Sequence, residues 1–164
     1  MYSIHFHLKF NVWANQKVVD MLANVDDAVL EKEVISSFPT IKKTLLHITD
    51  AQQLWLTRLK GGKTPIWPST QFTGGKKELL KGLVQSAQDL ADFVATKDQA
   101  FLDNSITYHN MKLIEYTNGV EQILFHVVNH GTFHRGQFIT MMRELGYTSF
   151  ENMDLSSYFR LYPL

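Results

Sequence analysis

The stretch FHVVNHGTFHRGQ, Phe125–Gln137, carries three histidines at steps of four residues. They are His126, His130 and His134, and the whole chain has 7 histidines and no cysteine. Four residues are close to one turn of an α-helix, so residues at this spacing are neighbours on a helix surface. The stretch therefore predicts a helix that brings histidines together on one side.

The periodicity of this helix extends well beyond the histidines. Asn118, followed by Glu121, predicts a capping box at its start, and Gly146 predicts its end after Leu145. The apolar side of this helix includes His134 and consists otherwise of Ile123, Val127, Phe138, Met141 and Leu145. At about 100° per residue, His130 lies roughly 40° from His134 and His126 roughly 80° from it. We expect His130 and His134 to point inward, and His126 to lie at the rim.

Three further segments have apolar residues at helical spacing, roughly 4–23, 38–62 and 76–96. In the second, Pro39 is suited to a position near the first helical turn, and Gly61 and Gly62 end the helix. Four amphipathic helices of about twenty residues predict an all-α four-helix bundle. No repeat or linker divides the chain, so we expect one domain over residues 1–164.

Two shorter segments complete the expected fold. The stretch NSITYHNMKLIEYTNG, Asn104–Gly119, alternates apolar and polar residues in part, which predicts a short β-hairpin or an extended loop before the fourth helix. Its central His109–Met111 could form the turn. The tail MDLSSYFRLYPL, Met153–Leu164, has room for one or two helical turns.

Composition excludes several classes of protein. The chain has 164 residues, and 16 Lys and Arg balance 16 Asp and Glu, whereas nucleic-acid binders usually carry a basic surplus. The absence of cysteine excludes disulfides and thiolate sites. The N-terminus does not resemble a signal peptide, and no run reaches the roughly twenty apolar residues that span a bilayer. We expect a cytoplasmic protein that binds neither nucleic acid nor membrane.

Two inward histidines on successive turns could share one metal ion. The alternative is a pair of core histidines satisfied by hydrogen bonds, since burying an unsatisfied polar ring costs about 1–3 kcal/mol. A site also needs a third ligand from another helix. The candidates are His47, on a flank of the second helix, His5 or His7 on the first, and His109, which also suits a solvated turn. Asp50 could be a ligand or orient an imidazole. Spacing does not choose among them.

Other polar residues have two possible roles each. Asn11 and Asn15 fall on the apolar face of the first helix, where they could orient a ligand or, by default, bond the backbone or each other. Gln137 could bond a ligand ring, although capping a buried donor is the default. Arg58 and Arg135 could hold an anionic substrate, although surface salt bridges are the default for both.

Three stretches together resemble the DinB family of helical metalloproteins. They are FNVWANQKVVDML, with Trp13, Ala14 and Asn15, then TLLHITDAQQLWLTRLKG, with His47, and LFHVVNHGTFHRGQFITMMRELGY, with His130 and His134. A lone H-x-x-x-H is weak, but NHGTFHRGQ preceded by LLH and WAN in that order is specific, and the resemblance covers nearly the whole chain. The family meant is the damage-inducible helical protein, which shares its name with a DNA polymerase.

The resemblance implies a four-helix bundle with up-down-down-up connectivity and a divalent ion held by three histidines. Carried over position by position, these ligands are His47, His130 and His134. The resemblance favours zinc or nickel, although imidazole nitrogens also suit iron and copper. Homodimers are usual in the family. Phe133 stands where many members have tyrosine, so a hydroxyl role is absent there.

The resemblance also implies a class of reaction. Characterised relatives include transferases that use low-molecular-weight thiols such as bacillithiol, and a mycothiol-dependent isomerase. We therefore expect a metal-dependent thiol S-transferase or hydrolase acting on a small electrophile. The alternatives are a non-catalytic metal-binding stress-response protein and a helical interaction module whose histidines are core residues. No H-E-x-x-H motif is present, so no catalytic base is assigned.

Overall fold

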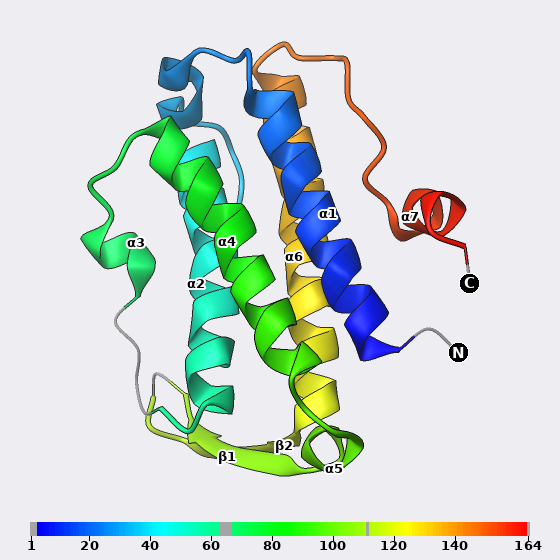
Figure 1. Ribbon diagram of the computed structural model, residues 1–164. Coiled ribbons are helices and arrows are strands. Elements are labelled where there is room, and N and C mark those ends of the chain that lie inside the picture. The colour runs from blue at the N-terminus through cyan, green and yellow to red at the C-terminus, as the bar shows by residue number, and fades with distance from the viewer. Residues whose placement is uncertain (1–2, 63–66, 111, 164) are drawn as a thin grey trace.

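Four long helices form the body of the protein in the computed structural model, which describes residues 3–62, 67–110 and 112–163 (Figure 1). The helices are α1 Ile4–Leu22, α2 Ile41–Leu59, α4 Lys76–Ala95 and α6 Val120–Glu144. α1 and α6 run in one direction and α2 and α4 in the other, which confirms the up-down-down-up bundle. α1 and α2 each pack against α4 and α6, so they occupy opposite corners. None of the described helices is long and apolar enough to span a membrane.

Short elements connect and flank the bundle. They are the 3₁₀ helix η1 Asp27–Glu31, the single-turn helices α3 Pro68–Gln71 and α5 Gln99–Leu102, and the C-terminal helix α7 Leu155–Leu161. The helical turns predicted for the tail are confirmed by α7. Sequence periodicity did not predict α3 or α5, because four residues are too few to show a helical period.

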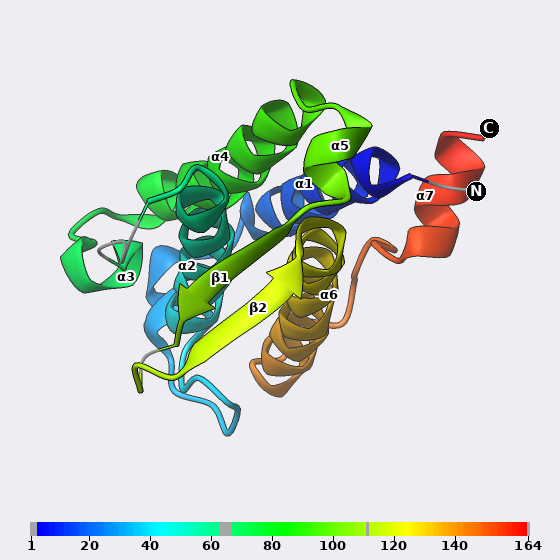
Figure 2. The same ribbon diagram turned by 90° about the horizontal axis from the view of Figure 1, so that it is seen from below.

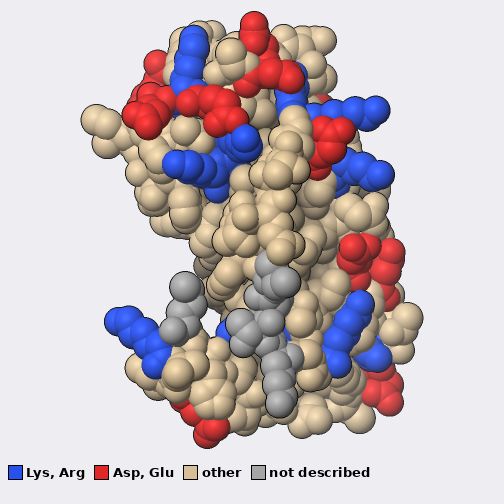
Figure 3. Space-filling model, turned by 90° about the vertical axis from the view of Figure 1, so that its left-hand side faces the viewer, with Lys and Arg blue, Asp and Glu red and all other residues tan. Residues whose placement is uncertain are grey.

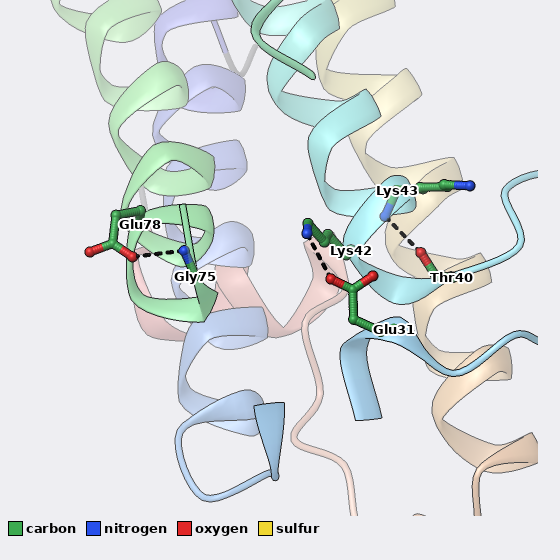
Figure 4. A network of polar contacts seen from close by, with 6 residues as sticks. All are labelled: Glu31, Thr40, Lys42, Lys43, Gly75 and Glu78. Atoms are coloured by element: carbon green, nitrogen blue, oxygen red, sulfur yellow. Dashed lines mark hydrogen bonds and ion pairs between the residues drawn. The ribbon is translucent and has the colours of Figure 1, made fainter. Parts of the chain in front are cut away.

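Capping side chains define the ends of α2. Thr40 is the N-cap, and its Oγ1 accepts a hydrogen bond from the Lys43 backbone N–H at 3.2 Å (Figure 4). Pro39 therefore directly precedes the N-cap, which places it near the first turn of α2, as predicted. Gly61, at φ 79°, lies just past the C-terminus, as expected for an αL residue. Lys42 also pairs with Glu31 at 2.6 Å, which fastens η1 to α2.

A two-stranded hairpin closes one end of the bundle, with antiparallel strands β1 Ser105–His109 and β2 Glu115–Gly119 (Figure 2). This confirms the hairpin prediction. In the connection, Asn110 Oδ1 accepts hydrogen bonds from the backbone N–H groups of Lys112 and Ile114, at 2.9 and 3.0 Å. Residue 111, part of the predicted turn, lies outside the described residues.

The predicted start of α6 is wrong by one residue. Asn118 belongs to β2, where its Oδ1 accepts a hydrogen bond from the Tyr108 hydroxyl at 2.8 Å. Gly119 is the N-cap instead, and its N–H donates to Gln122 Oε1 at 3.1 Å. The Asn118 side chain is used across the hairpin and so is not available to cap α6.

The core consists of two apolar clusters along the bundle axis. The hairpin-end cluster includes Ile4, Leu8, Trp55, Leu90, Val94, Ile123 and Val127. The far-end cluster includes Val18, Leu22, Ile41, Leu45, Leu83, Phe138 and Met141. Between them lie five buried polar residues, which we call the polar layer: Asn11, Asn15, Gln52, Ser86 and Arg135. The bundle is thus apolar at both ends and polar at mid-height.

Candidate metal centre

Three histidines converge where α2 packs against α6. The possible ligand nitrogens of His47, His130 and His134 all lie within 4.8 Å of one another. His47 Nε2 is 2.9 Å from His130 Nε2, and the His130 and His134 ring centroids are 4.4 Å apart. The structure therefore brings together the three histidines that the family resemblance selected.

Burial keeps these imidazoles neutral at pH 7. The pKa of His130 is lowered from 6.5 to about 3, mainly by burial and to a lesser extent by the neighbouring His134 and His47. Burial also lowers the pKa of His47, and the neighbouring His134 lowers it by a smaller amount. For His134, burial again lowers the pKa, while the hydrogen bond with Gln137 opposes it. Neutral imidazoles offer the lone pairs that a metal ion needs.

The histidines fit a divalent ion better than they fit a closed hydrogen-bond network. Nitrogens that bind one ion at about 2.0–2.1 Å lie roughly 3 Å apart, close to the separation of the His47 and His130 Nε2 atoms. His130 Nδ1 is buried and has no hydrogen-bond partner among the described residues. Hydrogen bonds among the described residues therefore do not form a closed network around His130. An all-imidazole donor set suits a borderline divalent cation such as zinc or nickel.

Gln137 fixes the orientation of one of these rings. Its Oε1 lies 2.7 Å from His134 Nδ1, and an amide oxygen only accepts, so Nδ1 carries the proton and Nε2 keeps its lone pair. Its Nε2 donates to Ser37 Oγ at 2.8 Å, which ties the 32–40 loop to α6. Gln137 thus accepts a hydrogen bond from the ring of His134, a contact that fits both roles predicted for it.

The remaining histidines lie outside the cluster. His126 is exposed at the rim, as predicted, with its ring centroid 5.9 Å from that of His130. His7 Nδ1 is 3.0 Å from the Ser3 carbonyl at the start of α1. His109 is exposed in β1, where its Nε2 lies 3.7 Å from Glu115 Oε2. His5, the other candidate of the first helix, does not join the cluster either.

Asp50, the other candidate on α2, does not join the three histidines and has a partner elsewhere. Its carboxylate accepts hydrogen bonds from the backbone N–H and the hydroxyl of Ser69, at 2.9 and 2.5 Å. It therefore anchors α3 against α2. Position on a helix flank could not reveal this partner, because Ser69 belongs to a short helix that the periodicity did not predict.

Among the described residues, neither arginine forms the surface salt bridge expected of it by default. Arg135 is buried, at 2% exposure, and its Nη1 donates to Asn11 Oδ1 and Asn15 Oδ1 at 2.7 and 2.8 Å. Burial lowers its pKa from 12.5 to about 9. Arg58 Nη2 donates to the His109 carbonyl at 2.7 Å. The inward position of Asn11 and Asn15, four residues apart, was the sequence signal for a buried donor between the helices.

Phe38 and a pocket adjoin the histidines. The Phe38 ring centroid is 4.3 Å from that of His47 and 5.8 Å from that of His134. A pocket of about 400 Å³ is lined by Phe38, His47, Leu46, Phe72, Lys42, Lys43, Glu31, Asp50 and Ser69. Figure 3 views the molecule from the side of α3, and its outline is indented at mid-height, below a region rich in charged side chains. Sequence reasoning missed Phe38 because it lies in an irregular segment.

Comparison with known proteins agrees with this fold. The family model described as "DinB family" matches residues 1–161. "Protein DinB" of Bacillus subtilis (strain 168) is 29% identical over 149 residues, which are 86% of this chain and 85% of that protein. A crystal structure of a DinB-like protein from Bacillus subtilis has a TM-score of 0.65 at 12% identity and covers 92% of this chain and 97% of its own, which shows the shared fold. The chain belongs to the DinB family.

Proposed function

We propose that the protein is a metal-dependent enzyme of the thiol S-transferase or hydrolase type, with a zinc or nickel ion held by His47, His130 and His134. The convergence of three neutral imidazoles from two helices carries this proposal. Within residues 3–62, 67–110 and 112–163, no carboxylate or further histidine joins them. Structural zinc is usually closed by four protein ligands, whereas catalytic zinc keeps a position open. Three ligands therefore favour a catalytic centre.

When bound, a divalent ion with an open position lowers the pKa of a coordinated water or thiol. The protein contributes the arrangement around that position. Burial holds His130 neutral, and Gln137 keeps the proton of His134 on Nδ1. Phe38 covers one face of His47 and limits the approach of water from that side.

The pocket beside His47 offers room for the reactants. Its apolar side chains, Phe38, Leu46 and Phe72, suit a small hydrophobic electrophile. Lys42 is paired with Glu31, which leaves Lys43 as the cation available to an acidic group of a low-molecular-weight thiol. We propose a small hydrophobic electrophile and a low-molecular-weight thiol as the two substrates. Homodimer formation is proposed on the family resemblance alone, and a cytoplasmic location is proposed on the sequence features described above.

A non-catalytic metal-binding stress-response protein is the second candidate. It is favoured because the carboxylates that line the pocket beside His47 already have partners, as Glu31 does in Lys42. The carboxylate that lines the same pocket near His47, that of Asp50, is already bonded to Ser69. A protein of this kind would bind the ion without turnover.

Cobalt-loaded protein separates the two candidates. Small thiols are added while the visible spectrum is recorded, and transfer to a fluorogenic electrophile is measured in parallel. The proposed enzyme predicts a sulfur-to-cobalt charge-transfer band and a transfer rate that His130→Ala abolishes. A full metal complement with an unchanged spectrum and no turnover would contradict the enzyme and favour the second candidate.

A further inference from the structure

The polar layer lies at the same height in the bundle as the three histidines. On α6, Arg135 directly follows His134, and on α2, Gln52 lies about one turn beyond His47. All five residues of the layer are nearly inaccessible, from 0% exposure for Asn15 to 2% for Arg135. Hydrogen bonds link the layer into one unit that joins all four long helices.

The bonds of the layer run in a fixed direction. Arg135, which can only donate, donates to the side-chain oxygens of Asn11 and Asn15 on α1. Their amide nitrogens then donate to Gln52 Oε1 on α2, at 2.9 and 3.2 Å. Gln52 Nε2 donates in turn to Ser86 Oγ on α4, at 3.0 Å. Every amide in this chain has one consistent orientation.

Such a chain defines the register of the helices. A shift of one residue along a helix moves a side chain by about 1.5 Å, which breaks bonds of this length, whereas apolar contacts adapt to small shifts. Buried polar residues are known to fix register between packed helices in this way. The path from Gln52 through Asn11 to Arg135 is also a side-chain connection between α2 and α6, the two helices that carry the histidines.

We infer that Arg135 and Gln52 are positioning residues of the metal centre, which hold α2 and α6 at the register where the ring of His47 meets those of His130 and His134. This inference rests on the proposed metal centre. It also gives a reason for burying the guanidinium group of Arg135. Within the described residues no carboxylate pairs with Arg135, so the energetic cost of burying this cation is not offset by an ion pair.

Metal affinity tests this inference without relying on catalysis. Arg135→Met removes the guanidinium that donates to both asparagines, and Gln52→Leu removes the amide oxygen that accepts from both. Both substitutions keep side chains of similar size. Val94→Ala, in the hairpin-end cluster, is the control that lowers stability without touching the layer. Cobalt dissociation constants are measured by chelator competition on folded protein, and urea unfolding of the metal-free forms gives their stabilities.

We expect the two layer variants to bind cobalt ~10-fold or more weakly, the loss typical of groups that orient ligands. Val94→Ala should bind like wild type despite its lower stability. If the two layer variants do not fold, Thr132→Val replaces them in the test. It removes only the acceptor of Arg135 Nη2, 3.0 Å away, and should weaken cobalt binding by a smaller factor. Wild-type affinity in the layer variants, or a loss that follows stability equally in Val94→Ala, would overturn the inference. Wild type without cobalt affinity would instead refute the metal centre.

Discussion

A methyl group added at Gly131 is expected to destabilise the protein, although alanine is the better helix former. Gly131 lies on α6 and faces Asn11 of α1. An ideal Cβ at this position would be 2.8 Å from Asn11 Oδ1 and 2.9 Å from Arg135 Nη1. These two atoms form a buried hydrogen bond of 2.7 Å. The methyl group would therefore force apart a donor and an acceptor of the polar layer.

The size of the effect follows from two opposing contributions. A hydrogen bond to a charged group contributes about 1.5–3 kcal/mol, and its loss here leaves both partners buried. Replacing glycine by alanine in a helix gains about 0.5–1 kcal/mol. The free energy of unfolding should therefore fall by about 0.5–2.5 kcal/mol in Gly131→Ala.

Gly136 provides the matched control on the same helix. A Cβ there would have no heavy atom within 4 Å outside its own helical neighbourhood, so Gly136→Ala should gain the helix-propensity contribution alone. Urea unfolding followed by far-UV circular dichroism, in the presence of a chelator, measures both variants. If Gly131→Ala were as stable as Gly136→Ala, the close approach of α1 to α6 and the role assigned to the Asn11–Arg135 bond would be wrong.

Three further outcomes are expected. Gln137→Ala should weaken zinc binding by ~10–100-fold in chelator competition, because the ring of His134 loses the partner that orients it. The urea midpoint of the metal-free protein should change little. An unchanged zinc affinity would show that the ring needs no such partner. For His130, the pKa is about 3 in the folded protein and near 6.5 when unfolded, so between these values the unfolded chain binds more protons and stability rises with pH. Metal-free protein should thus have a lower urea midpoint at pH 5 than at pH 7. If His130→Ala showed an equally large difference between the two pH values, the pH dependence would belong to another group. Asp50→Asn should keep the full metal complement by elemental analysis, because its carboxylate bonds Ser69; loss of metal would make it a ligand.

Helical periodicity was sufficient for the main architecture. The apolar residues of α4, Leu79, Leu83, Ala87, Leu90 and Val94, are all buried as their spacing predicts. The pair His130 and His134 faces inward for the same reason, because a helix repeats every 3.6 residues and only positions on its apolar side meet the core. What periodicity describes is one helix at a time.

Helical periodicity could not predict contacts between helices. His47 shares no local pattern with His130, which lies 83 residues away, and only the family resemblance selected it over His5, His7 and His109. The polar layer was not predicted for the same reason. Arg135 was assigned to the surface because arginine is rarely buried, and the other four residues of the layer come from three other helices. Long-range partners depend on how the helices are arranged, which no single helix encodes.

Metal content tests the central claim most directly. Untagged protein is purified without added metal or chelator and measured by elemental analysis, beside His130→Ala and the rim control His126→Ala. Three converging imidazoles predict about one zinc or nickel ion per chain in wild type and in His126→Ala, and almost none in His130→Ala. Wild-type protein that carries no metal and takes up none on incubation with zinc or nickel, or His130→Ala that retains a full complement, would contradict the three-histidine centre.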